Sequence, residues 1–209
     1  MAAIKIPPPK HLSDMVFNDS ATQKRVAQYA NCKRTGNIIL HGPKGTGKST
    51  AARGIIQGVF DIHNNPNAVP EFHAKEFADA AQMVARIYGE WNFQGAWGIQ
   101  YPYVIINEVE QLGAERLRQL RSVMDGTEVG KFIFTTNNIH ALDEPFLDRC
   151  DDIEMPPIDI TQWRPKVYDW LRANDIEVGS ELVERMLETS TGTIRDLKRI
   201  VEDIACECD

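Results

Sequence analysis

The segment GPKGTGKST, Gly42–Thr50, is the feature that most limits what this chain can fold into. It satisfies the pattern G-x-x-x-x-G-K-[ST] in full. The apolar run Asn37–Leu40 precedes it and predicts a short buried strand. From Lys48 the sequence predicts an amphipathic helix, whose apolar face consists of Ala51, Ala52, Ile55, Ile56 and Val59. A glycine loop between a strand and a helix predicts a phosphate-binding loop.

The chemistry of such a loop explains its residue types. Backbone N–H groups point at a phosphate, and the helix N-terminus adds its dipole. Lys48 is expected to supply charge to the β- and γ-phosphates, and the Ser49 hydroxyl to ligate Mg²⁺. We therefore predict that a nucleotide binds here with Mg²⁺ and contacts the whole loop: Gly42, Pro43, Lys44, Gly45, Thr46, Gly47, Lys48, Ser49 and Thr50.

A second polar site follows the buried run YVII, Tyr103–Ile106, where the sequence continues with Asn107 and Glu108. P-loop hydrolases present an acid at such a strand end to orient Mg²⁺. The Asn107 carbonyl oxygen can still accept a hydrogen bond from a metal-bound water, but it carries no charge. Glu108 keeps a carboxylate that can polarise an attacking water. We predict weakened Mg²⁺ binding rather than abolished hydrolysis; the alternative is that this segment merely starts a solvated helix.

The remaining pattern alternates strands with helices, which predicts an α/β fold with a mainly parallel sheet. Helices are expected at 21–30, 75–91 and 114–125, and further strands at 131–136 and 151–155. After Pro156-Pro157 only helical patterns follow, at 163–173, 181–189 and 193–206. We therefore predict a nucleotide-binding α/β domain over residues 1–157 and a small all-helical lid domain over residues 158–209.

Composition narrows the function classes. No apolar run among the 209 residues approaches the length of about 18 needed to span a membrane, so we expect no membrane contact and a cytoplasmic protein, or a nuclear or organellar one in a eukaryote. Proteins that bind DNA mainly through its phosphate backbone are normally basic, whereas this chain has a net charge of −7. We therefore expect DNA contact only within an assembly. Four cysteines show no metal-ligand spacing, which argues against zinc.

Taken in chain order, these motifs resemble those of AAA+ ATPases, and within that group the clamp-loader branch, which includes replication factor C small subunits and their phage and bacterial relatives. The resemblance implies a P-loop NTPase fold that binds ATP. PKHLSDMV, Pro9–Val16, resembles the N-terminal box that lines the adenine pocket, which implies a role for Met15 and Val16. VIINEVEQL matches the apolar strand followed by Asp-Glu, with Asn107 in place of the usual Asp.

Two further segments resemble the family's sensors of the γ-phosphate. FIFTTNN is similar to the sensor-1 strand, which implies that Asn137 contacts the γ-phosphate or a water. TGTIRDLKRIVE is similar to the sensor-2 helix, which implies that Arg195 reaches the γ-phosphate from the lid. Each has a simpler alternative: Asn137 could cap a turn, and Arg195 could belong, with Arg199, to the solvated face of the last helix.

A third segment, PFLDRCD, resembles the one whose arginine reaches the ATP of the next subunit. The resemblance implies that Arg149 acts in trans, although Asp148 stands where the family has Ser. The alternative is a surface ion pair, because Arg149 lies among acidic residues. DNA contact, if present, is expected from Arg116, Arg118 and Arg121, which could equally form a solvated helix face.

The resemblance implies an ATPase of DNA replication or repair that works in a homo- or hetero-oligomer of AAA+ subunits on a sliding clamp or another ring protein. A nucleotide-gated adaptor or helicase-loader-like switch with slow hydrolysis is the alternative that Asn107 favours. An unfoldase would need a pore-loop aromatic such as Trp91, Phe93 or Trp97 and ranks lowest. Clamp loaders continue after the sensor-2 helix into a helical collar, so we expect either a truncated chain or a compact relative.

Overall fold

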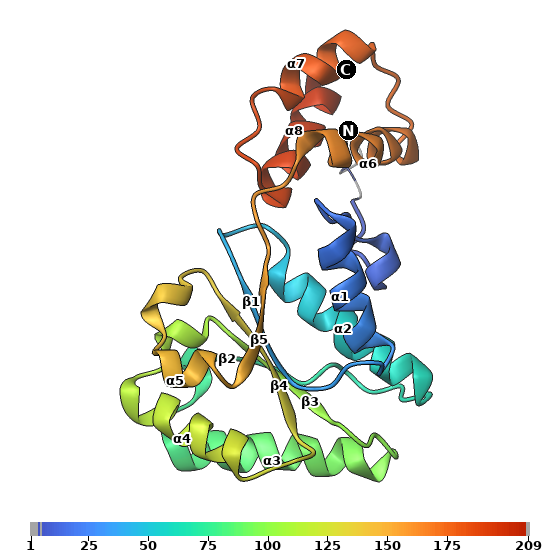
Figure 1. Ribbon diagram of the computed structural model, residues 1–209. Coiled ribbons are helices and arrows are strands. Elements are labelled where there is room, and N and C mark those ends of the chain that lie inside the picture. Colours follow the sequence, from blue (N-terminus) through green and yellow to red (C-terminus); the bar gives the residue numbers. More distant parts are fainter. Residues whose placement is uncertain (1–3, 5, 208–209) are drawn as a thin grey trace.

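The computed structural model describes residues 4 and 6–207 and shows a parallel sheet covered by helices on both faces (Figure 1). The sheet has five strands in the order β2-β3-β4-β1-β5, and every pairing is parallel. The strands are β1 Asn37–His41, β2 Glu71–His73, β3 Tyr103–Asn107, β4 Lys131–Thr136 and β5 Cys150–Glu154. The predicted fold class, a P-loop α/β domain with an added helical region, is confirmed.

Two pairs of long helices cover the sheet. The helices α1 Ser20–Ala30 and α2 Lys48–Ile62 pack on one face, and α3 Ala80–Ala96 and α4 Ala114–Asp125 on the other (Figure 1). A short helix, α5 Glu144–Leu147, leads into β5. Single 3₁₀ turns lie at Leu12–Asp14, Ala74–Glu76, Val109–Gln111 and Ile139–Ala141.

Burial on both faces explains why the strands are continuous apolar runs rather than alternating ones. In β4, Phe132 and Phe134 face α3 and α4, whereas Ile133 faces α1 and α2. In β1, Ile39 belongs to the first of these cores and its neighbours Ile38 and Leu40 to the second. Since parallel strands end at one edge, the chain segments after β1, β3 and β4 come together there.

A third hydrophobic cluster lies in the helical region formed by α6 Ile160–Ala173, α7 Ser180–Leu187 and α8 Ile194–Glu207. Ile158 belongs to this cluster, and Ile4, Ile6 and Val16 of the N-terminal segment pack against it. Figure 1 shows these helices standing above the carboxyl edge of the sheet. The boundary at residues 157/158 stays a prediction. Among the described residues, no helix has the length and apolar character required to cross a membrane.

The third long helix differs from its prediction. Residues 74–76 form a 3₁₀ turn, and α3 begins at Ala80, where the Asp79 side chain accepts a hydrogen bond from the backbone N–H of Gln82. The helix then continues to Ala96, so the segment from Trp91 to Trp97, which the sequence left undefined, is mostly helical. Trp91 is buried and donates to the Lys131 carbonyl, whereas Phe93 is half exposed.

Candidate nucleotide-binding site

The phosphate-binding loop is built on three glycines with positive φ, Gly42 at +140°, Gly45 at +82° and Gly47 at +95°. Side chains rarely adopt such angles, and at Gly42 a Cβ would also lie 2.1 Å from the carbonyl oxygen of Met155. The loop therefore passes tightly beneath the segment that leads to the lid. It ends at Lys48, the first residue of α2, so the helix N-terminus faces the loop.

Lys48 is buried, and its ammonium donates to the carbonyl oxygens of Gly42 at 2.8 Å and Pro43 at 2.6 Å. Burial lowers the pKa of Lys48 to about 8. The carboxylates of Glu110 and Glu108 oppose this shift and Arg195 adds to it. A buried ammonium held only by carbonyls is ready to pair with an anion, because a phosphate would supply the missing countercharge.

A cleft of about 470 Å³ opens between the loop, the ends of β3 and β4, and the start of α8. This volume is in the range of small-molecule sites. Five cationic side chains line it, so the cleft is basic although the chain is acidic. The lining residues are Lys44, Gly45, Gly47, Lys48, Ser49, Thr50, Arg53, His73, Glu108, Thr135, Asn137, Ile194, Arg195 and Lys198.

Most of the predicted site residues meet in this cleft, and some lie just behind it. Gly42, Pro43 and Thr46 do not line the cleft; Thr46 is buried, and its hydroxyl donates to the Pro43 carbonyl. Met15 is buried beside Gly47, within the core under α1 and α2. Val16 packs against the lid cluster instead. Neither Met15 nor Val16 lines the cleft, so their adenine-pocket role stays a prediction.

Asn107, at the end of β3, is almost fully buried at 1% exposure. Its Oδ1 accepts hydrogen bonds from the hydroxyls of Ser49 and Thr135, both at 2.8 Å. Its Nδ2 donates to a carboxylate oxygen of Glu71 on β2, at 2.5 Å. The amide thus joins the phosphate-binding loop to β4 and β2.

The donor set at this point suits a Mg²⁺ that arrives with phosphates. The Ser49 hydroxyl lies at the edge of the cleft, with the neutral Oδ1 of Asn107 directly behind it, and Mg²⁺ normally takes one or two protein groups plus phosphate oxygens and waters. Within the part of the chain that the structure describes, no group of three or more His, Cys, Asp or Glu could hold a metal by itself. Cys208 lies outside the described residues.

Glu108 follows in a left-handed conformation with φ +55°, which is uncommon for a residue other than glycine. Its backbone N–H donates to the Thr135 hydroxyl at 3.3 Å, and its carboxylate accepts from Gln111 at 2.6 Å. Asn137 lies across the cleft, where its backbone N–H donates to Glu110 at 3.1 Å. The carboxylate of Glu108, the amide of Asn137 and the ammonium of Lys48 therefore line the same cleft.

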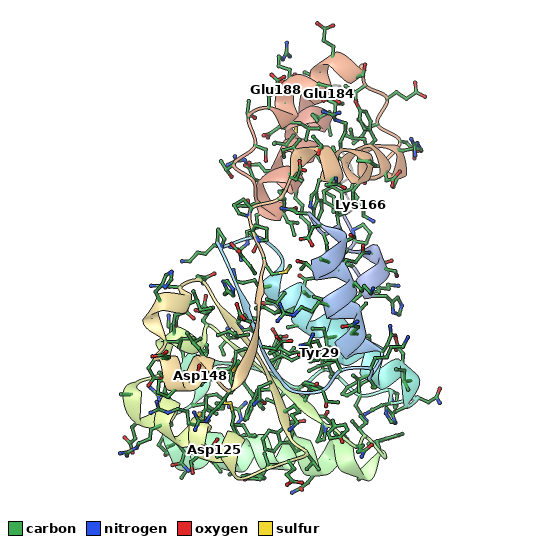
Figure 2. All side chains as sticks on the ribbon, viewed as in Figure 1. Tyr29, Asp125, Asp148, Lys166, Glu184 and Glu188 are labelled. Atoms are coloured by element: carbon green, nitrogen blue, oxygen red, sulfur yellow. The ribbon has the colours of Figure 1, made fainter. Side chains whose placement is uncertain are left out.

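Arg149 lies elsewhere, at the opposite edge of the sheet. It precedes β5, whose first residue, Cys150, pairs with Asn37 at the start of β1. Its guanidinium forms an ion pair with Asp125, with Nε to Oδ1 at 2.7 Å and Nη2 to Oδ2 at 2.9 Å. Figure 2 shows Asp125 far from Lys166 and Glu184 in the lid. Arg149 therefore does not reach the cleft of its own chain.

The sequence did not single out Arg53, His73, Thr135, Ile194 and Lys198, which also line the cleft. Helical spacing could have found Lys198, because it follows Arg195 by three residues on α8. The backbone N–H of Ile194 donates to the Gly45 carbonyl at 2.9 Å, so the lid helix touches the phosphate-binding loop directly. Arg199 is not at the cleft and pairs with Asp196.

The expected DNA-contacting arginines are largely engaged within the chain. Arg116 donates to the Phe77 carbonyl at 2.6 Å, and Arg121 forms an ion pair with Asp143. Both are attached to α4, on the sheet face opposite α2. A role in DNA binding would therefore compete with contacts that these arginines already make.

This geometry defines a P-loop nucleotide-binding protein with a helical lid. The model of the AAA family (ATPase family associated with various cellular activities) matches residues 38–157, more than half of the chain, and the protein belongs to this family.

Individual relatives confirm the resemblance to the clamp-loader branch. The replication factor C small subunit of Staphylothermus marinus is 23% identical over 198 residues, covering 94% of this chain and 60% of its own length. The replication factor C subunit 4 of Arabidopsis thaliana is 22% identical, covering 90% and 58%. The chain thus spans about 60% of the length of these relatives. Among solved structures, the RuvB Holliday junction branch migration motor of Thermotoga maritima is similar in fold, with a TM-score of 0.74, 15% identity and coverage of 96% of this chain and 71% of its own.

Proposed function

We propose that the chain binds ATP with Mg²⁺ and hydrolyses it, as a clamp-loader-type subunit in DNA replication or repair. The observation that carries this proposal is the basic cleft between the phosphate-binding loop and α8, with Glu108 at its wall. Five cationic side chains and a helix N-terminus match a triphosphate in charge.

Each residue of the cleft has a distinct task in this proposal. The backbone N–H groups of the loop and Lys48 hold the β- and γ-phosphates, and the Ser49 hydroxyl supplies a magnesium ligand. Glu108 polarises the attacking water as general base. Asn137 orients that water or the γ-phosphate, and Arg195 stabilises the negative charge that develops.

A binding assay tests these assignments before any turnover is measured. Replacement of Lys48 by Ala, or of Arg195 by Ala, should weaken binding of a non-hydrolysable ATP analogue by at least about tenfold, since each removes a charged hydrogen bond to phosphate. Arg172→Ala is the matched control, because Arg172 is an exposed lid cation on α6 that lies outside the cleft. Equal affinities in all four proteins would contradict the proposed site.

The lid gives ATP binding a mechanical output in this proposal. The lid contacts the nucleotide through Arg195 and Lys198 only while the γ-phosphate of ATP is present, so the ATP-bound state favours a closed lid. Hydrolysis removes that contact and releases α8 from the cleft. We infer that the angle between the domains 1–157 and 158–209 reports the nucleotide state.

Assembly with other AAA+ subunits is the second part of the proposal. Arg149 is far from its own cleft, which is what an arginine that completes a neighbour's site requires. Sedimentation with a non-hydrolysable ATP analogue should then show self-association that Arg149→Ala abolishes. Because Arg149 is at the surface, the same variant should keep the parent's unfolding midpoint. An unchanged monomer with and without the analogue would contradict the trans role.

The larger role rests on similarity to replication factor C subunits, which the chain matches over about 60% of their length. We propose a sliding clamp or another ring protein as partner, and DNA contact only within the assembly. Turnover that rises on addition of primed DNA with a sliding clamp supports this role. Turnover that is indifferent to both favours the alternative, a nucleotide-gated adaptor or helicase-loader-like switch with slow hydrolysis, which the neutral Asn107 favours.

A further inference from the structure

The feature that the proposed function leaves unexplained is the buried contact between Asn107 and Glu71. Glu71 lies on β2, next to β3, and its side chain is 18% exposed. Its Oε1 accepts a 2.5 Å hydrogen bond from Asn107 Nδ2, while Arg53 donates to both of its oxygens, at 2.6 and 2.9 Å. The carboxylate of Glu71 is therefore hydrogen-bonded directly to Asn107, the amide that replaces the expected acid.

This contact fixes which way the Asn107 amide faces. An amide presents a donor on one side and an acceptor on the other. With the carboxylate of Glu71 on one side, the NH₂ must face Glu71, because a carbonyl oxygen there would be repelled. The acceptor Oδ1 is thereby turned towards the hydroxyls of Ser49 and Thr135.

The charge of Glu71 also reaches further than its own hydrogen bond. Hydrogen-bonded polar groups polarise one another in a medium of low dielectric, so a carboxylate on Nδ2 makes Oδ1 more negative. Asn107 is 1% exposed, and solvent screens this effect little. Oδ1 is consequently a stronger acceptor for the Ser49 hydroxyl, or for a water beside it, than an isolated amide would be.

We propose that Glu71 and Asn107 together form a displaced acid, in which the negative charge of the magnesium site resides on β2 and acts through the Asn107 amide. Glu71 is a positioning residue, since it touches neither the phosphate-binding loop nor the reacting atoms. This proposal rests on the proposed function for the identity of the ligand, Mg²⁺ with a triphosphate. Its structural core, the coupling of residues 71 and 107, holds without any ligand.

The displaced charge makes a specific prediction about replacing Asn107. Asn107→Asp in the parent would bring two carboxylates within hydrogen-bond distance in a buried place, where they repel. In the Glu71→Gln background the same substitution leaves a single charge at the site, as in the parent. The double variant therefore exchanges the position of the charge and conserves its amount, whereas either single variant changes the amount.

The experiment is a double-mutant cycle with two readouts. The first is the affinity for a non-hydrolysable ATP analogue with Mg²⁺ and with EDTA, and the second is the thermal unfolding midpoint of the nucleotide-free protein. Glu71→Gln should weaken the Mg²⁺-dependent affinity about tenfold, the loss of roughly one charge-assisted hydrogen bond, and leave the affinity in EDTA unchanged. Glu71→Gln with Asn107→Asp should restore it to the parental value or better.

Glu76→Gln is the matched control, because Glu76 forms a surface ion pair with Arg86 and both residues lie outside the cleft. If Glu71 served only an ion pair of this kind, Glu76→Gln and Glu71→Gln would change Mg²⁺-dependent affinity alike, and the proposal would be overturned. Additive effects of Asn107→Asp in both backgrounds would overturn it too. If no variant, the parent included, binds the analogue, the proposed function fails by itself; the unfolding midpoints then still decide whether residues 71 and 107 are coupled.

Discussion

Replacement of Gly42 by Ala tests how tightly the phosphate-binding loop is held beneath the segment that leads to the lid. The new Cβ would lie 2.1 Å from the Met155 carbonyl oxygen and 2.9 Å from its carbon, well inside ordinary van der Waals contact. Met155 cannot easily move away, because its N–H donates to the His41 carbonyl at 2.7 Å. The φ of +140° adds backbone strain for any side chain.

The two costs set the expected magnitude. Strain of about 1–3 kcal/mol and overpacking of about 1–3 kcal/mol together predict a loss of roughly 3–5 kcal/mol in the free energy of unfolding. For a chain of this size the unfolding midpoint should fall by roughly 10 °C. Urea and thermal denaturation measure both quantities.

Gly89→Ala is the matched control for this substitution. Gly89 lies in the interior of α3, and apart from the backbone of its own helix nothing lies within 4 Å of the position that an added methyl group would take. The same change should therefore stabilise by about 0.5–1 kcal/mol through helix propensity. Two Gly→Ala changes of opposite sign are thus expected in one protein. An unchanged midpoint for Gly42→Ala would refute the close approach of loop and linker.

Three further predictions concern charge and the lid. Burial lowers the pKa of Lys48 to about 8, and a bound phosphate favours its ammonium form. ATP binding near pH 8.5 should therefore take up part of a proton, whereas binding at pH 6.5 should take up almost none. Calorimetry in buffers of different ionisation enthalpy measures this proton uptake, which Lys48→Met should abolish. Leu197→Ala, at a fully buried position of α8, should destabilise the lid by about 2–5 kcal/mol and weaken ATP binding, because the same helix carries Arg195. Urea denaturation and analogue binding measure the two effects. A lid of unchanged stability with unchanged affinity would contradict the role of Leu197 in the lid core. Burial of Asp151 disfavours its ionised form, but hydrogen bonds from Arg25 and Tyr29 outweigh this and hold its pKa below the usual value, so Asp151→Asn should cost stability at pH 7. That difference should shrink as the pH falls through the lowered pKa, which urea denaturation in a series of buffers from pH 7 downwards measures; a difference that stays constant with pH would contradict the assignment.

Local sequence patterns predicted the central sheet well because its strands are buried on both faces. The run KFIFTT coincides with β4 and AERLRQLRSVMD with α4, each bounded by Gly or a polar turn. The start of α3 was missed although Asp79 and Gln82 have the spacing of a helix N-cap. The strand β2 has three residues, too few to show a period, and its pairing with β3 depends on tertiary structure.

Local sequence patterns likewise predict one part of the candidate site and miss another. A contiguous motif predicted the phosphate-binding loop, because its chemistry needs fixed spacing along one segment. The partners of Asn107 come from three other elements, with Glu71 lying 36 residues away, and no local pattern indicates such a contact. The pairing of Arg149 with Asp125, 24 residues apart, is likewise a product of packing. Long-range hydrogen bonds therefore set the surroundings of Asn107 and Arg149, and these contacts appear only in the folded structure.

The most direct test of the account is steady-state ATP turnover at saturating Mg²⁺ in the parent and in Glu108→Gln, with analogue binding measured in both. Glu115→Gln is the matched control, since Glu115 is an exposed carboxylate on α4 outside the cleft. We expect Glu108→Gln to lower turnover at least about 100-fold and to keep ATP binding, because a general base contributes that much. A parent that binds ATP but turns over no faster than Glu108→Gln would contradict it, and the protein would then be a nucleotide-dependent assembly switch.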